Sequence, residues 1–84
     1  MNFEESRLIY LQGVEQIAIG NYKAGIKILE DNLSELDPDI LVVVYAEIAK
    51  AAVEDNDIVK ARQYATLALS IEPELPSARK ILGL

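Results

Sequence analysis

The sequence contains no cysteine, no histidine and no tryptophan, and the first two absences exclude whole classes of chemistry. A chain without cysteine has neither disulfides nor a thiolate nucleophile, and a chain without histidine lacks the commonest metal ligand and the commonest acid–base group. Aromatic residues make up only 6% of the chain. The core must therefore be filled mainly by alanine, isoleucine, leucine and valine, which suits close-packed helices better than a β-sandwich.

Basic residues are also scarce. The chain has 8 lysine and arginine residues against 14 acidic ones, which gives a net charge of −6. An acidic surface repels a phosphate backbone, and the basic residues are spread along the chain, so nucleic acid is not an expected partner. A length of 84 residues allows one domain with a single core.

The polar residues form no recognisable catalytic or metal-binding motif. The stretch Asp55-Asn56-Asp57 resembles the start of a calcium loop, but the glycine and the bidentate glutamate of such a loop are missing. The serines have no histidine to activate them, and no glycine-rich phosphate loop is present. We therefore expect no enzyme activity, no metal site and no cofactor.

One apolar run, from Asp39 to Val53, lies at the centre of the sequence. Three consecutive β-branched residues, Val42 to Val44, favour a strand locally. The run is too long for an ordinary strand and is rich in alanine, which favours a helix buried on several sides. The charges at Glu47 and Lys50 interrupt it well short of a membrane span. We interpret it as a helix and expect no membrane insertion.

Turn and cap residues divide the chain into five predicted helices. Asn2 and Glu5 have the spacing of a capping box that opens a helix at about Phe3. Further turns are indicated at Gly20-Asn21, where the asparagine would cap the second helix, at Leu36 to Asp39, at Asp55 to Asp57, and at Glu72 to Pro76. Links this short predict antiparallel neighbouring helices.

Three of these helices show apolar stripes at helical spacing. The stripe of the first helix consists of Leu8, Leu11, Val14, Ile17 and Ala18. The stripe of the second consists of Tyr22, Ile26, Leu29, Leu33 and Leu36. The stripe of the fourth consists of Ile58, Ala61, Tyr64 or Ala65, Ala68 and Ile71.

An internal repeat becomes visible from Tyr45 onward. The residues there follow the pattern Tyr45-x2-Ile48-Ala49-x2-Ala52-x8-Ala61-x3-Ala65-x2-Ala68-x4-Pro73. This pattern resembles the tetratricopeptide repeat, a helix-turn-helix unit of about 34 residues. The resemblance implies an all-α fold, a right-handed array of antiparallel helix pairs with five helices. The single domain, residues 1–84, would comprise a first repeat at about 3–37, a second at about 38–73 and a capping helix at about 75–83.

Small residues at family-like positions indicate close helix packing. Gly13, Gly25, Ala49, Ala61 and Ala68 would let neighbouring helices approach closely, because they lack the bulk that holds helices apart. An unrelated helical bundle with ordinary alanine positions is the alternative.

In tetratricopeptide proteins the first helix of each pair lines a concave groove that holds a peptide or helix from another protein. The groove positions that the resemblance implies here are Tyr10, Val14, Ile17, Val43, Ala46, Glu47, Lys50 and Val53, with Ser77 or Lys80 closing one end. The alternative is that Val14, Ile17 and Val53 belong to the core. The Lys, Asn and Arg clamp with which some members hold a terminal carboxylate is absent.

The resemblance implies a non-catalytic protein–protein interaction module, an adaptor or chaperone-like protein that binds a peptide or amphipathic helix through an apolar groove. The alternative is a self-associating structural module, a homodimer or part of a longer array, since repeat proteins usually need about three repeats. The apolar stretch from Ile81 to Leu84 favours that alternative. The acidic start of the chain lacks the features of a signal peptide, so we expect a cytoplasmic location.

Overall fold

In a computed structural model that describes residues 1–84, the chain forms five α-helices and contains no strand. The helices are α1 (Phe3–Ala18), α2 (Tyr22–Asn32), α3 (Leu41–Glu54), α4 (Ile58–Ile71) and α5 (Pro76–Leu82), and short 3-10 turns occupy Leu33–Glu35 and Pro38–Ile40. The expected all-α class and the expected number of helices are confirmed.

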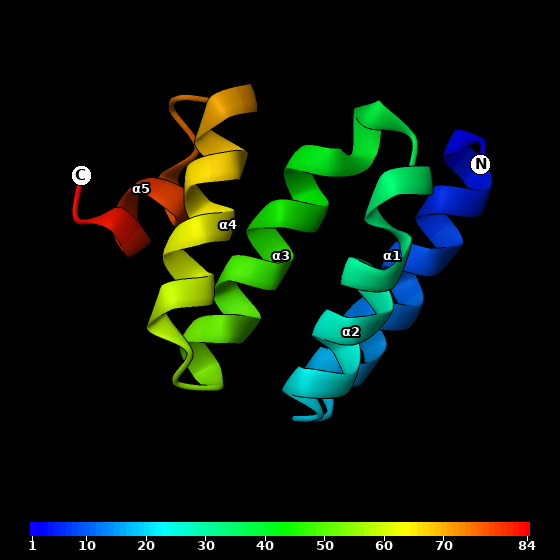
Figure 1. Cartoon of the computed structure of the whole chain (residues 1–84), viewed down its shortest axis with the longest axis horizontal. Coiled ribbons are helices and arrows are strands. Elements are labelled where there is room, and N and C mark those ends of the chain that lie inside the picture. The colour runs from blue at the N-terminus through cyan, green and yellow to red at the C-terminus, as the bar shows by residue number, and fades with distance from the viewer.

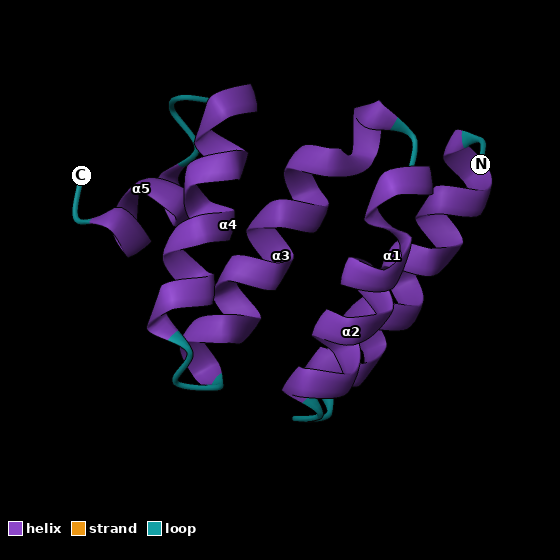
Figure 2. Ribbon diagram, viewed as in Figure 1, coloured by secondary structure: helices purple, strands orange, loops and turns teal.

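The helices are arranged as two antiparallel pairs followed by a short fifth helix. The ribbon shows α1 and α2 side by side at one end, α3 and α4 as the second pair, and α5 next to α4 at the opposite end from α1 (Figures 1 and 2). The central helix, α3, contacts each of the other four helices. Its apolar character on nearly all sides follows from that position, because it has protein neighbours in several directions.

The core is built around α3. Val44, Ile48 and Ala52 are fully buried in it, so the last residue of the Val42 to Val44 triplet packs against the chain's own helices. The strand that these residues favour locally does not form, since tertiary packing overrides a weak local preference. The helix begins later than predicted, at Leu41, because Pro38–Ile40 form a 3-10 turn whose Asp39 amide donates to the Asp37 carboxylate over 2.9 Å.

The crossing of α1 and α2 depends on two glycines. A Cβ atom on Gly25 would lie 2.7 Å from the Gly13 carbonyl oxygen and 2.6 Å from the Ile17 side chain, and one on Gly13 would lie 2.6 Å from Leu29. These distances are too short for a real side chain, so α1 and α2 approach this closely only because both positions are glycine. The predicted close approach at Gly13 and Gly25 is confirmed.

The predicted cap residues of α1, α2 and α4 are confirmed. The Asn2–Glu5 capping box is present in both directions, and the Asp57 side chain accepts from the Lys60 amide at the start of α4. Asn21 is the N-cap residue of α2, as predicted, but its side chain accepts no hydrogen bond from the start of the helix. Its amide instead donates to the Gln16 side chain over 3.1 Å, which joins the end of α1 to the turn.

Two predicted apolar stripes are partly wrong. On α1 the buried positions are Ser6 and Gly13, whereas Leu8 and Leu11 are 51% and 43% exposed. On α4 the three alanines of the stripe are buried, but the outer members Ile58 and Ile71 are exposed. Both errors have one cause: α1 and α4 pack through small residues, so their larger side chains are left partly in solvent.

Candidate functional site

A pocket of about 640 Å³ lies where the C-terminal half of α3 meets α5 and the start of α4, next to the end of α1. Its apolar lining is Ile17, Ala51, Val53, Ile58, Ala61 and Ile81. Its polar lining is Lys50, Glu54, Arg62, Ser77 and Lys80. The site thus draws side chains from four helices, with α3 supplying the largest share.

Small side chains and a short helix create this hollow. Ala51 and Ala61 are almost completely buried, so their short side chains form the floor of the pocket. The seven-residue helix α5 forms the far wall. It starts at Pro76, where proline suits the first helical position, and ends at Gly83, whose φ of +75° is readily adopted only by glycine.

Three of the eight predicted groove residues, Ile17, Lys50 and Val53, line this pocket. Ser77 and Lys80, expected at one end of the groove, line it as well. Val53 is 37% exposed and therefore available to a ligand, whereas Ile17 also packs against the buried core.

The other five predicted residues do not line the pocket. Tyr10, Val14, Ala46 and Glu47 are half-buried, and Val43 is 44% exposed on α3. They lie on the same two helices, α1 and α3, but outside the hollow.

Two of these five residues, Tyr10 and Glu47, interact electrostatically, and Glu47 also pairs with a pocket residue. Burial raises the pKa of the Tyr10 phenol, and the nearby Glu47 carboxylate raises that pKa further. The Glu47 carboxylate also lies 3.4 Å from the Lys50 ammonium group. Because Lys50 lines the pocket, Glu47 lies next to the site.

The sequence did not identify Ile58 and Arg62 on α4 as members of the site. The tetratricopeptide resemblance assigns the groove to the first helix of each pair, and α4 is a second helix. The two residues are four positions apart, a spacing that places them on the same helix face. This spacing alone could have linked them, but nothing in the sequence indicates that α5 leaves the face open.

Other polar groups in the turns have structural partners. Asp55 pairs with Lys23 of α2, and Asp57 caps α4. No group of three histidine, cysteine, aspartate or glutamate side chains lies close enough to hold a metal ion.

We compared the chain with models of protein families, with curated proteins and with solved structures. None of them matches it. No helix has both the length and the apolar composition that are needed to cross a membrane.

Proposed function

We propose that the chain is a non-catalytic interaction module that binds a peptide or an amphipathic helix of another protein in the pocket between α3, α4 and α5. The observation that carries this proposal is the pocket itself, about 640 Å³ with a mainly apolar lining. Val53 and Ile58 at this site are 37% and 49% exposed, so apolar surface there is still open to a ligand. Burying such surface is the main favourable term in most protein association.

We further propose that the two helix pairs are tetratricopeptide repeats and that α5 is their capping helix. The residue spacing from Tyr45 to Pro73 supports this assignment, as do the antiparallel pairs and the contact between Gly13 and Gly25. A right-handed superhelical arrangement and an adaptor or chaperone-like role in the cytoplasm follow from the same proposal.

A substitution at the pocket tests this function. Val53→Glu places a charge on the apolar lining, and we expect the variant to lose partners that the wild-type chain captures from cells. The matched control is Val59→Glu, because Val59 is 70% exposed on α4 and does not line the pocket. If Val53→Glu still captures the same partners as the wild type and Val59→Glu, the pocket assignment is wrong.

Self-association is the second candidate, and exposed apolar side chains on α1 favour it. Leu8 and Leu11 are 51% and 43% exposed on one face of that helix, where no other helix covers them. If α1 forms a homodimer contact, the sedimentation coefficient should rise with protein concentration. Leu8→Glu should abolish that rise, whereas a concentration-independent monomer would exclude this candidate.

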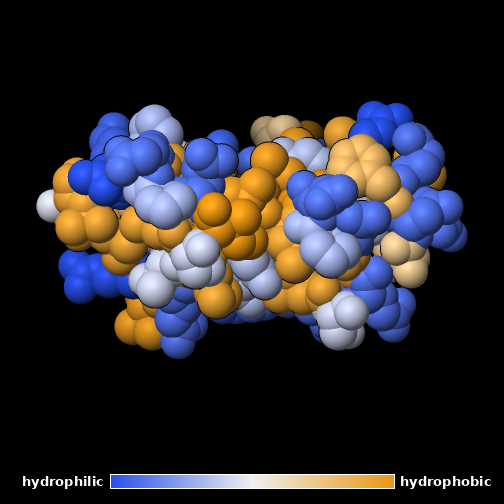
Figure 3. Space-filling model, turned by 90° about the horizontal axis from the view of Figure 1, so that it is seen from above, coloured by the Kyte–Doolittle hydropathy of each residue, from blue (hydrophilic) through white to orange (hydrophobic).

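A second apolar region lies on the surface at the end of the molecule where α3 begins. Apolar atoms gather in the middle of this surface, and polar atoms flank them on both sides (Figure 3). This surface is separate from the pocket lining near the other end of α3. It therefore offers a further contact region in either candidate function.

A further inference from the structure

We infer that the occupant of the pocket is an acidic amphipathic segment of another protein, with an aliphatic side chain against the apolar lining and carboxylates beside Lys50, Arg62 and Lys80. The inference rests on the proposed function and names the chemistry of the ligand.

The pocket concentrates positive charge in an acidic protein. Three of the eight lysine and arginine residues line it, but only one of the 14 acidic residues, Glu54. The balance of charge at the site is therefore the reverse of that of the chain as a whole, whose net charge is −6.

Two of the three pocket cations have no carboxylate partner within the chain, and outside the pocket only Arg79 shares this property. Outside the pocket, carboxylates lie within ion-pair distance of Arg7, Lys23, Lys27 and Lys60. Arg62 and Lys80 take part in no ion pair within the chain. Lys50 lies 3.4 Å from Glu47, yet its side chain is 55% exposed and can reach a second carboxylate.

The three cations come from three different helices around one apolar floor. Lys50 belongs to α3, Arg62 to α4 and Lys80 to α5, and Ala51 and Ala61 lie beneath them. An aliphatic side chain placed on this floor has cationic groups on several sides. Carboxylates one helical turn from that side chain, on the same face of a ligand helix, would then lie near them.

The acidic surface elsewhere adds specificity to this arrangement. An acidic ligand is repelled by the rest of the chain, and surface charges act over only about 10 Å at 0.1 M salt. Favourable contact is thus restricted to the pocket, which is how charge complementarity selects a binding register. A basic ligand would instead meet repulsion at the pocket.

Three helix-forming peptides of leucine and alanine test the inference, identical except that their charged positions carry glutamate, glutamine or lysine. Binding of each fluorescein-labelled peptide is measured by fluorescence anisotropy against the full chain. We expect the glutamate peptide to bind about tenfold more tightly than the glutamine peptide, from several partly exposed ion pairs acting together.

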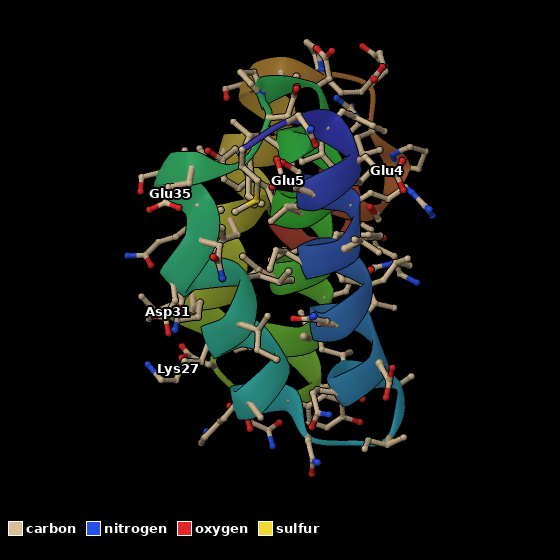
Figure 4. All side chains as sticks on the ribbon, turned by 90° about the vertical axis from the view of Figure 1, so that its right-hand side faces the viewer. Glu4, Glu5, Lys27, Asp31 and Glu35 are labelled. Atoms are coloured by element: carbon tan, nitrogen blue, oxygen red, sulfur yellow. The ribbon has the colours of Figure 1, made fainter.

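Charge-matched variants locate the effect. Arg62→Gln and Lys80→Gln should each weaken binding of the glutamate peptide about threefold and affect the glutamine peptide less. The control is Lys27→Gln, which removes the same charge from α2. Figure 4 shows Lys27 and Asp31 on the outer edge of that helix and Glu35 in the turn after it, all pointing away from the molecule.

Each outcome bears on one proposal or the other. Equal binding of the glutamate and glutamine peptides, abolished by Val53→Glu, would overturn the acidic ligand and leave the groove function standing. Preference for the lysine peptide, or equal losses in Lys27→Gln and Lys80→Gln, would also overturn it. If a second copy occupies the pocket, the wild-type chain should sediment as a dimer that Val53→Glu dissociates, and the acidic ligand would again be wrong.

Discussion

The phenol of Tyr64 donates a hydrogen bond of 2.8 Å to the carboxylate of Glu30, 34 positions earlier in the chain. The other oxygen of the same carboxylate accepts from the Lys60 ammonium group over 3.0 Å. Glu30 belongs to α2 and both donors belong to α4, so these bonds tie the first helix pair to the second across α3. The Tyr64 ring also lies 6.0 Å from that of Tyr45 on α3, which completes the connection.

Removing the hydroxyl in Tyr64→Phe should lower the free energy of unfolding by about 1 kcal/mol at neutral pH. A hydrogen bond to a charged acceptor contributes about 1.5–3 kcal/mol, and this one is reduced because the pair is partly exposed and Glu30 keeps its bond to Lys60. Urea unfolding followed by circular dichroism measures the difference. Tyr22→Phe, outside this network, serves as the control.

The same pair predicts a loss of stability in alkali. Burial is the largest cause of a raised Tyr64 pKa, and the hydrogen bond to Glu30 raises that pKa further. Above about pH 10, the ordinary phenol pKa, the unfolded chain loses this proton while the folded chain keeps it. The stability from Tyr64 is therefore complete below that pH and falls as pH rises towards the folded pKa. The wild-type advantage over Tyr64→Phe should shrink in that range, and a constant difference would contradict the linkage.

Much of the fold could be predicted from local signals. The capping box at Asn2, the prolines at 38 and 76 and the glycine at 20 mark helix ends through backbone restrictions that operate without tertiary structure. The stripes of α1 and α4 could not be predicted as well. Their buried positions are glycine, serine and alanine, residues for which periodicity of large apolar side chains carries no signal.

The glycine crossing gives a test of packing between α1 and α2. Gly25→Ala should improve helix propensity by about 0.5–1 kcal/mol and yet destabilise the chain by about 1–2 kcal/mol overall, because the new methyl meets the Gly13 carbonyl at 2.7 Å. Thermal unfolding measures the balance. Ala24→Gly, at the exposed neighbouring position, should cost only the propensity difference. A Gly25→Ala variant more stable than the wild type would show that the two helices can move apart.

Ala61→Leu tests the small residues at the contact between α3 and α4. Ala61 is completely buried in the core cluster, so a leucine there should overpack it and cost about 1–3 kcal/mol. The melting temperature should fall by several degrees, since about 1 kcal/mol corresponds to roughly 4–8 °C in a domain of this size. Ala18→Leu, at an exposed position of α1, should have little effect. An unchanged melting temperature in Ala61→Leu would contradict the tight contact.

The candidate site was less predictable than the fold. Lys50 and Val53 could be identified because the tetratricopeptide resemblance marks the faces of first helices. Arg62 became part of the site only through the packing of α4 against α5, which depends on the whole arrangement of helices. Charge clustering around a pocket is a tertiary property, because the three cations come from separate helices whose sequence positions show no patch.

Ser6 provides the last test, at the junction of the first helix with the turn before α3. It is the only fully buried polar side chain of the core, and its hydroxyl oxygen accepts from the Asp37 amide over 2.8 Å. Ser6→Ala leaves that amide without its acceptor, so we expect a loss of about 1–3 kcal/mol in the free energy of unfolding. Ser34→Ala, at an exposed position, should change stability by less than about 0.5 kcal/mol.

Hydrogen exchange distinguishes the bond between Ser6 and Asp37 from general packing. The Asp37 amide should exchange faster in Ser6→Ala, while the amides in the middle of α4 should change only as much as global stability does. Unchanged protection at Asp37 would mean that another acceptor, such as water, replaces the hydroxyl at no cost.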